Sequence, residues 1–213
     1  LNAQVDALLA VLSVEDIDRA HFVGLSYGGF VGLKMLPTDR VQSLTLIGVG
    51  GGGWTETEFK ALAEQFDVPD LPSLFVPHSI EDTRKLVDIC FHIPTALVPK
   101  SFDAALYGNV FGRHPEAQRA LLWNLQEEAS NVTMWTTRMT ERTPSLLIVG
   151  RQDPIFSIED VQELNQILSG EMLTYRWADH VPQVGYRRKF NRDLKLFLSQ
   201  HTMMPSIEHE SME

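Results

Sequence analysis

Five residues, Gly24-Leu25-Ser26-Tyr27-Gly28, constrain this chain more than any other segment. They lie between a short apolar run and a helical pattern, and G-x-S-x-G in that context is typical of a sharp turn that lifts a serine above the edge of a parallel sheet. We expect Gly24, Gly28 and Gly29 to give clearance on either side of Ser26, where neighbouring backbone comes close. The backbone amide of Tyr27, at the start of the helix, would face developing negative charge. The segment predicts a nucleophile with half of an oxyanion hole, the alternative being a glycine-rich turn that only eases packing.

The rest of the chain predicts strands alternating with helices, which is typical of an α/β fold. Strand-length apolar runs are expected to form a buried parallel sheet, at 20–23, 41–49, 145–149 and 173–177. Helical periodicity covers 5–12, 27–36, where Pro37 is expected to stop the helix, 158–168 and 188–198. The intervening segment has short helical patterns and many prolines, which indicate an inserted helical cap. The expected division is core at 1–53, cap at 54–142, core again at 143–200 and a disordered tail at 201–213.

The composition fits one folded domain and excludes several classes of protein. With 213 residues, 44% of them hydrophobic, the chain can close a core without disulfides, and its one cysteine cannot form an internal bridge. A net charge of −10 has the wrong sign for neutralising phosphates, so nucleic acid is not an expected partner. No zinc-site spacing is present, and neither metal nor cofactor is expected. No apolar stretch is long enough to span a bilayer, which favours a cytoplasmic or peripherally membrane-associated protein. The sequence does not predict its oligomeric state.

A serine hydroxyl needs a base in order to attack, so the turn predicts an acid and then a histidine further along the chain. Asp153 follows the predicted strand 145–149, and His180 lies in the loop after the predicted strand 173–177. The carboxyl ends of neighbouring parallel strands meet at one edge of a sheet, where open α/β sheets bind their ligands. We therefore predict that Ser26, Asp153 and His180 form a catalytic triad.

Other residues could take these roles, but each has a simpler structural interpretation. Asp153 could instead cap the turn before Pro154, a common use of Asp-Pro. Glu159 and Asp160 could replace it as the acid, but they begin a helix, where acids ordinarily complement the helix dipole. The remaining histidines lie at the wrong end of a strand, in the cap or in the tail, and a structural role is expected for each. They are His21, His78, His92, His114, His201 and His209.

The cap has two notable features. Its first residues follow four glycines, 50–53, which match neither phosphate-loop pattern and are expected to form a flexible hinge. It is also rich in aromatic residues, most of which are expected to form the cap's own core, while a minority line an apolar cleft above Ser26. These residues are Trp54, Phe59, Phe66, Phe75, Phe91, Phe102, Phe111, Trp123 and Trp135.

Three segments together resemble the α/β-hydrolase fold family: Gly-Leu-Ser-Tyr-Gly-Gly at Ser26, Val-Gly-Arg-Gln-Asp at Asp153 and Asp-His-Val-Pro at His180. The resemblance implies a mostly parallel, doubly wound sheet with an inserted helical cap. In the cap, residues 86–94, followed by Val98-Pro99, look like a segment of monoacylglycerol lipases and related bacterial lipases. The resemblance thus implies a serine esterase that cleaves carboxylic esters, such as acylglycerols or other lipid esters, through an acyl-enzyme.

The chain departs from the family pattern in three places. Family members carry four strands and a His-Gly loop, which supplies the second oxyanion donor, before the helix at which this sequence starts. The resemblance therefore implies an N-terminally incomplete hydrolase that is inactive alone or needs that part. Pro37 comes early after the turn, and Asp179 stands where a glycine is usual. Two alternatives stay open: a lactonase or C–C bond hydrolase with the same triad, and a non-catalytic small-ligand-binding protein or inactive hydrolase fragment.

Overall fold

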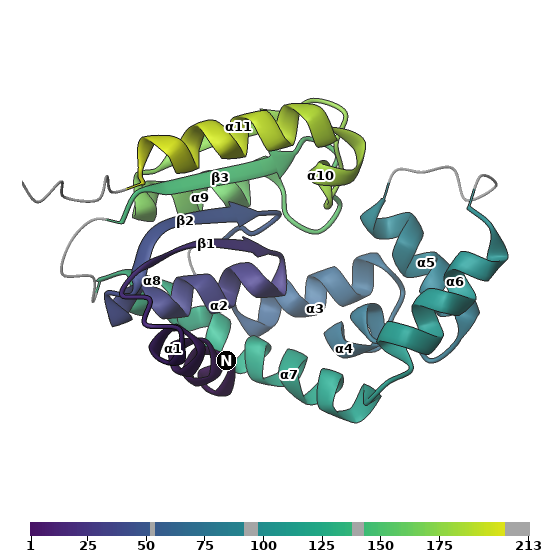
Figure 1. Ribbon diagram of the computed structural model, residues 1–213. Coiled ribbons are helices and arrows are strands. Elements are labelled where there is room, and N and C mark those ends of the chain that lie inside the picture. The colour runs from purple at the N-terminus through teal and green to yellow at the C-terminus, as the bar shows by residue number, and fades with distance from the viewer. Residues whose placement is uncertain (52–53, 92–97, 138–142, 203–213) are drawn as a thin grey trace, which may run out of the picture.

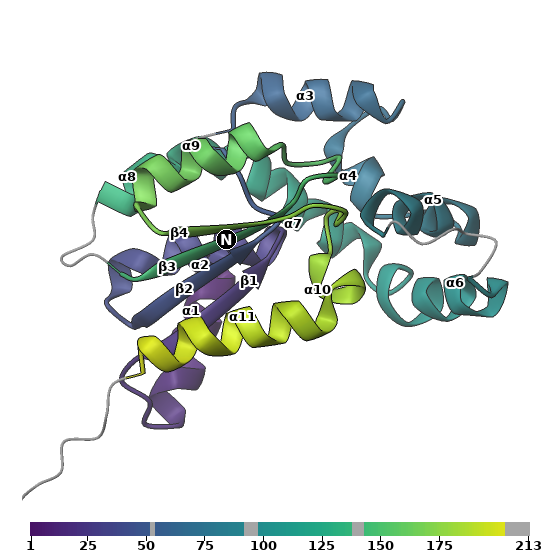
Figure 2. The same ribbon diagram turned by 90° about the horizontal axis from the view of Figure 1, so that it is seen from above.

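The computed structural model describes residues 1–51, 54–91, 98–137 and 143–202, which form a parallel sheet, helices on its two faces and a group of helices beyond one end of its strands (Figure 1). The strands are β1 (Ala20–Leu25), β2 (Val41–Ile47), β3 (Ser145–Gly150) and β4 (Glu171–Tyr175). They lie in the order β1-β2-β3-β4, and each neighbouring pair is parallel. All of their carboxyl ends therefore meet at the edge of the sheet that faces the cap (Figures 1 and 2).

Helices cover both faces of the sheet. The helices of the core are α1 (Asn2–Val14), α2 (Tyr27–Met35), α9 (Ile158–Leu168), α10 (Pro182–Gly185) and α11 (Arg187–Gln200). Figure 1 shows α11 above the sheet and α2 below it, with α1 packed on α2. This arrangement is the mostly parallel, doubly wound fold that the sequence predicts.

The strand β3 shows why its sequence is apolar throughout. Leu146 and Ile148 pack in one cluster with Phe197 of α11, whereas Leu147 and Val149 belong to the cluster on the opposite face. Successive side chains of a strand point to opposite faces, so a strand covered on both sides has only buried positions. All six residues of β3 are buried accordingly.

The cap lies between β2 and β3 in the chain. Its helices are α3 (Glu56–Gln65), α4 (Leu71–Phe75), α5 (Ile80–Cys90), α6 (Lys100–Leu106), α7 (Pro115–Glu128) and α8 (Val132–Thr137), with a π-helical turn at Tyr107–Phe111 and a 3-10 turn at Ala129–Asn131. Figures 1 and 2 show α5 and α6 farthest from the sheet. The last cap helix returns to the core, because α8 packs on α2 and Trp135 joins the same apolar cluster as Phe30. None of the described helices is both long and apolar enough to cross a membrane.

All four strands differ from their predicted bounds. The strands β1 and β3 run slightly past their predicted carboxyl ends. The strand β2 ends at Ile47, not at residue 49, because Gly48 turns the chain with a φ of 55°. The strand β4 covers 171–175, not 173–177, and Trp177 lies beyond it with 62% of its surface exposed. Gly170 sets this earlier start: a Cβ there would lie 2.4 Å from the carbonyl oxygen of Ser145, so β4 is already against β3 at that point.

The helix after the serine turn also ends slightly early. The helix α2 stops at Met35, and Pro37 lies within a 3-10 turn, Leu36–Thr38, that follows it. Part of the expected glycine hinge, 52–53, and the expected tail from 203 lie outside the described residues.

Candidate active site

Ser26 occupies a sharp turn at the carboxyl end of β1. The strand ends at Leu25, the helix α2 begins at Tyr27, and Ser26 between them has a φ of 49° and a ψ of −120°. A residue with a side chain rarely adopts a positive φ, so the surrounding structure must hold it there. The N–H of Ser26 donates to the carbonyl of Ile47 at 2.9 Å, and the N–H of Gly29 donates to the carbonyl of Ser26 at 2.8 Å. Backbone hydrogen bonds on both sides therefore fix the serine.

The turn is tight at Gly24 and Gly29. A Cβ at Gly24 would lie 2.5 Å from the carbonyl oxygen of Gly28, and a Cβ at Gly29 would lie 2.3 Å from a methyl group of Val49. The prediction that Gly28 is needed for clearance is wrong, because a Cβ there would meet nothing within 4 Å. The α-carbon of Gly28 faces open space, and only its carbonyl is pressed against Gly24.

Asp153 and His180 are hydrogen-bonded to each other. The imidazole Nδ1 of His180 lies 3.0 Å from Oδ2 of Asp153, and both side chains are almost fully buried. The other carboxylate oxygen, Oδ1, accepts the N–H groups of Ile155 at 2.9 Å and Phe156 at 3.1 Å. Asp153 therefore does both things that the sequence allowed as alternatives: Oδ1 caps the turn around Pro154, and Oδ2 contacts the histidine.

The end of β2 contacts both His180 and Ser26. A Cβ at Gly48 would lie 2.9 Å from Nδ1 of His180, and the peptide group before Gly48 carries the Ile47 carbonyl that binds the Ser26 N–H. Ser26 and His180 are thus both fitted to the Ile47–Gly48 segment. Within the described residues, the Ser26 hydroxyl makes no hydrogen bond, to His180 or to any other group. Such contacts are often long without substrate and tighten when it binds.

Tyr27 places a backbone amide beside the serine. As the first residue of α2, Tyr27 has no helical carbonyl available to accept its N–H, and the positive end of the helix dipole lies at the same point. The amide is therefore available to a negatively charged oxygen at the turn.

The alternative residues occupy other places. Asp160, with Ser157, forms a capping box at the start of α9, where its Oδ2 accepts the Ser157 N–H at 2.7 Å. Nδ1 of His21 lies 2.7 Å from the hydroxyl of Ser43, at the opposite end of the strands from Ser26. The other described histidines outside the site are His78, His114 and His201, and two lie outside the described residues, His92 and His209.

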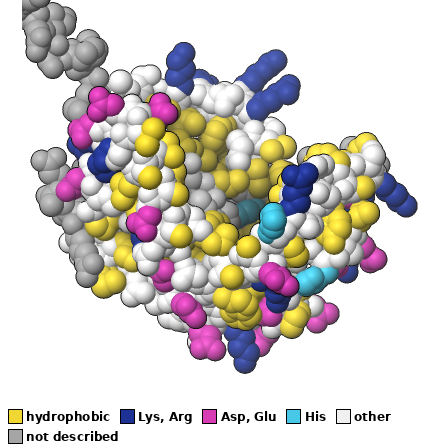
Figure 3. All heavy atoms as spheres, turned by 60° about the horizontal axis from the view of Figure 1, so that its bottom comes forward, with side chains coloured by type: hydrophobic (Ala, Val, Ile, Leu, Met, Phe, Trp, Pro, Cys, Tyr) yellow, Lys and Arg dark blue, Asp and Glu magenta, His cyan; other side chains and the backbone are white. Residues whose placement is uncertain are grey.

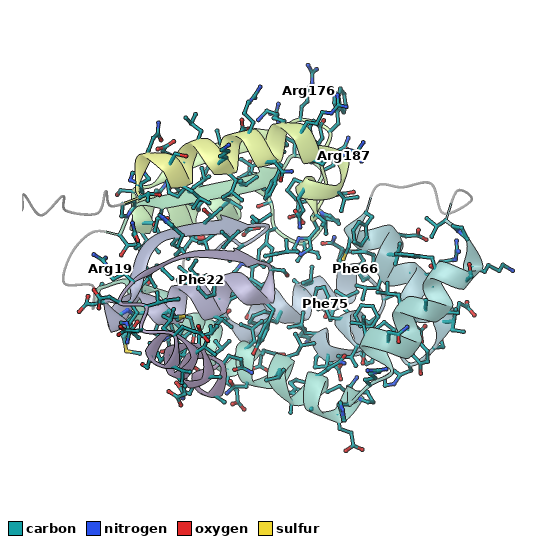
Figure 4. All side chains as sticks on the ribbon, viewed as in Figure 1. Arg19, Phe22, Phe66, Phe75, Arg176 and Arg187 are labelled. Carbon is teal, nitrogen blue, oxygen red and sulfur yellow. The ribbon has the colours of Figure 1, made fainter. Side chains whose placement is uncertain are left out.

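A cavity of about 130 Å³ opens beside Ser26. Its walls are mainly aromatic and aliphatic side chains from both the core and the cap. The aromatic residues are Tyr27, Phe30, Trp54, Phe59, Phe75 and Phe156. The aliphatic residues are Leu62, Leu71, Leu122, Leu125 and Ile155. In Figure 3 hydrophobic side chains gather in the hollow between the core and the cap, and Figure 4 shows Phe75 on the side of the cap that faces the sheet.

The expectation for the cap aromatics is met in part. Trp54, Phe59 and Phe75 line the cavity beside the serine. Phe102 and Trp123 line neither the cavity nor a buried core, because they are 50% and 43% exposed. They lie on helices whose outer side has no further layer of the described chain to cover it.

Two residues that the sequence reasoning did not single out help to build the site. Phe156 stacks on the imidazole of His180, with centroids 6.1 Å apart, and contacts Trp54 in a tilted arrangement at 4.7 Å, so it joins the cavity wall to the histidine. Gly48 gives the imidazole its space. The signal for Gly48 was a glycine inside an apolar strand pattern, which often marks a close approach; the signal for Phe156 was an aromatic residue directly after the Asp-Pro turn.

The cap reaches the acid at the end of α5. Burial, together with the negative charges of Asp153 and Asp179, raises the pKa of the Cys90 thiol to about 12. Asp179, the residue that stands where the family has a glycine, has a buried side chain whose Oδ1 accepts the N–H of Val181 at 3.3 Å. Within the described ranges, no group of three His, Cys, Asp or Glu side chains could hold a metal ion.

The strand order and the likeness to solved structures show that this chain has the α/β-hydrolase fold. No family model matches the sequence. The chain is 27% identical over 202 residues to a 2-hydroxy-6-oxononadienedioate/2-hydroxy-6-oxononatrienedioate hydrolase of Cupriavidus pinatubonensis, covering 93% of this chain and 68% of that protein. It is 25% identical to 3-oxoadipate enol-lactonase 1 of Acinetobacter baylyi, over 86% of this chain and 65% of that one.

Solved structures show the same fold. A meta-cleavage product hydrolase from Pseudomonas fluorescens superposes with a TM-score of 0.74 and 19% identity, covering 94% of this chain and 72% of that one. A bacterial membrane phospholipase A superposes with a TM-score of 0.72 and 20% identity, covering 93% and 63%. The relatives are hydrolases, and the names of the two sequence relatives above specify a hydroxy-oxo-dienedioate and an enol-lactone, not a lipid ester.

Proposed function

We propose that this chain is a serine hydrolase that cleaves a C–C bond or a lactone C–O bond beside a carbonyl group in a small oxo compound. The observation that carries the proposal is the buried pair of Asp153 and His180, which lies at the same strand ends as the serine turn. The similarity in sequence to a C–C hydrolase and an enol-lactonase favours these reactions over the cleavage of lipid esters.

The proposed reaction begins with attack by Ser26 on the carbonyl carbon. Asp153 accepts a hydrogen bond from the Nδ1–H group of His180, which leaves the Nε2 lone pair free to take the proton of the serine hydroxyl. A C–O bond forms, and the electron pair of the carbonyl moves onto its oxygen. The N–H of Tyr27 is the donor that we assign to that oxygen. Loss of one such donor typically slows catalysis about 10²- to 10³-fold.

The intermediate then collapses and breaks the bond to the leaving atom. The protonated His180 returns its proton to that atom, which is the ring oxygen of a lactone or the carbon of a C–C substrate. A carbon can leave only if its electron pair is delocalised, so a C–C substrate needs a conjugated carbonyl on the departing side. Water, deprotonated by His180, then releases the acid from Ser26.

The cavity restricts the substrate. Its described wall contains no Lys, Arg or His side chain, and in Figure 4 Arg176 lies above α11 and Arg187 at the start of that helix. A carboxylate in this cavity would be buried without a counter-ion, which is strongly unfavourable. We therefore propose that the group of the substrate that enters it is uncharged, in contrast to the dioates in the relatives' names.

A second candidate is a carboxylic ester hydrolase acting on acylglycerols or other lipid esters. The apolar wall of the cavity favours it, because a short acyl chain would contact aromatic and leucine side chains throughout. The same three residues would serve, with an alcohol as the leaving group.

A substrate panel separates these reactions. Purified protein and its Ser26→Ala variant are assayed with a 2-hydroxy-6-oxo-dienoate that carries a neutral 6-substituent, an enol-lactone, short p-nitrophenyl esters and a monoacylglycerol. We expect the highest kcat/KM on one of the first two and a loss of about 10⁴-fold or more in the variant. A fluorophosphonate should label the wild type and not the variant. Turnover of the monoacylglycerol alone would show that the protein is a carboxylic ester hydrolase. Absence of both turnover and labelling would refute the proposal that it is a serine hydrolase.

A further inference from the structure

The charge of the chain is unevenly distributed. The net charge is −10, yet residues 172–202 carry six Lys and Arg side chains against two acids, both Asp. One of these acids, Asp179, is buried, and the other, Asp193, forms ion pairs with Lys189 and Arg192. The other four bases of the segment are exposed and make no ion pair with a described residue: Arg176, Arg187, Arg188 and Lys195. An acidic protein therefore carries a local excess of positive charge on its surface.

The helix α11 directs much of this charge outward. One side of the helix packs on the sheet through Phe190 and Phe197, which are buried. Residues three or four apart share one side of a helix, so the opposite side presents its own row of residues. That row consists of exposed side chains, Arg188, Arg192, Lys195 and Leu196, the last with 60% of its surface exposed. The outer face of α11 is therefore basic and includes an exposed leucine.

Trp177 lies beside the start of α11. Its N–H donates to the hydroxyl of Tyr186, the residue before the helix, at 3.2 Å. The tryptophan is 62% exposed, and the guanidinium of Arg176 lies 4.9 Å from the centre of its ring. In Figure 4 Arg176 lies above α11, on the side to which the outer face of the helix points. Arg176 and Trp177 thus extend the basic outer face of α11 past its first residue.

We propose that this surface docks on a membrane that contains anionic lipids. We call it the α11 surface, and it consists of Arg176, Trp177, Arg188, Arg192, Lys195 and Leu196. Basic side chains are attracted to an anionic bilayer, and tryptophan is enriched at the boundary between lipid and water. Because Trp177 and His180 lie in one loop, docking would hold the proposed active site close to the bilayer.

The apolar side chains of the α11 surface favour lipid over nucleic acid as the anionic partner. Leu196 and Trp177 can enter the boundary between headgroups and acyl chains, whereas a leucine gains little against a phosphate backbone. The inference concerns binding alone and does not depend on the proposed reaction.

Vesicle sedimentation measures the binding directly. The full chain is mixed with vesicles of phosphatidylcholine alone, or of phosphatidylcholine with about 30% phosphatidylglycerol. We expect binding to the second kind only, and an apparent affinity that falls at least about tenfold when KCl is raised from about 0.05 to 0.5 M, because salt screens surface charge. Equal binding to the two kinds, or binding to neither, would overturn the inference.

Charge reversal tests the location of the surface. The double variant Arg188→Glu with Lys195→Glu should bind the anionic vesicles at least about 30-fold more weakly than the wild type. The matched control is Lys60→Glu with Lys85→Glu, which lowers the net charge equally at cap positions that are 75% and 66% exposed. Circular dichroism checks that both variants are folded. An equal loss of binding in the two double variants would overturn the inference, because it would show an effect of total charge.

Trp177 tests the apolar part of the surface. Lipids with brominated acyl chains quench the fluorescence of a tryptophan that enters the bilayer, so anionic vesicles made with them should quench the wild type. The quenching should be lost in Trp177→Phe and retained in Trp123→Phe, the matched control, since Trp123 is 43% exposed on the cap. Quenching that persists in Trp177→Phe would overturn the inference. Tighter binding to duplex DNA than to the anionic vesicles would also overturn it, and would assign the surface to nucleic acid.

Discussion

The core side and the cap side of the site are held in different ways. On the core side, backbone hydrogen bonds position Ser26, the Asp153 carboxylate holds His180, and nearby glycines could not be replaced without close clashes. On the cap side, the cavity wall is held by packing of rings, such as Trp54 against Phe59 in an edge-on contact at 5.3 Å. Backbone contacts tolerate little displacement, whereas packed side chains can change rotamer and volume. Under the proposed function, the core would therefore set the chemistry and the cap would set which substrate fits.

The largest effect on the core side is expected at the acid. In Asp153→Asn, the amide would hold the imidazole in the wrong tautomer, so kcat should fall about 10⁴-fold. Thermal unfolding should change far less, since the amide oxygen can still accept the two backbone N–H groups of the turn. Steady-state kinetics beside a melting curve check this, and an unchanged kcat would assign the acid role to another residue.

Cys90 tests whether the cap is closed over the acid in solution. With a pKa near 12, the thiolate fraction at pH 8 is about 10³-fold below that of a thiol with the ordinary value of 9.0. Alkylation by iodoacetamide should be slower by a similar factor, and its rate should still be rising between pH 9 and 11, where a free thiol has levelled off. Mass spectrometry against the unfolded protein gives the comparison. Rapid labelling of the folded protein would show that α5 stands away from the core.

Gly48→Ala should lower activity and stability by disturbing the core side of the site, with no direct effect on the cap. Alanine at a φ of 55° is strained, and its methyl group would push on the imidazole of His180. We expect kcat to fall about 100-fold and unfolding free energy to fall by roughly 1–3 kcal/mol. Gly185→Ala is the matched control, because a Cβ there meets nothing within 4 Å. Equal behaviour of the two variants would contradict the fit of Gly48 to the histidine.

The two glycines of the serine motif should respond with opposite signs. Gly24→Ala forces a methyl group onto the Gly28 backbone and should cost about 3 kcal/mol of stability. Gly28→Ala adds a methyl group in open space within α2 and should stabilise by about 0.5–1 kcal/mol. Chemical denaturation measures both. Similar losses in the two variants would mean that the motif needs both glycines for clearance, as the sequence alone suggests.

The smallest effect is expected on the cap side. Phe75→Ala removes an aromatic wall of the cavity, so KM should rise about tenfold with a smaller change in kcat. A larger fall in kcat than rise in KM would show that the cap also positions the reacting groups.

The sequence was most informative where function and local structure coincide. Ser26, Asp153 and His180 each follow a strand, so their meeting at one sheet edge could be predicted from strand order alone. Their detailed fit could not, because it depends on contacts between distant segments, such as Gly48 against His180 and Gly150 against the carbonyl of Asp179.

The cap was predicted as a unit but not in detail. Short helices, one of them π-helical at Tyr107–Phe111, carry little periodicity, and their exposed and buried faces are decided by packing on other segments. Trp123 illustrates this, because an exposed tryptophan cannot be distinguished from a buried one by sequence. The similarities in sequence, not the motif, shifted the proposed reaction from esters to C–C bonds and lactones.

The end of β2 positions two of the proposed catalytic residues, Ser26 and His180. The N–H of Ser26 donates to the carbonyl of Ile47, and the imidazole of His180 packs against Gly48, one residue later. If β2 paired one residue out of register, Ser26 would lose its hydrogen bond to Ile47 and His180 its contact with Gly48 at the same time. Recovery of the proposed activity during refolding would therefore report that the whole sheet has formed with β2 in the correct register.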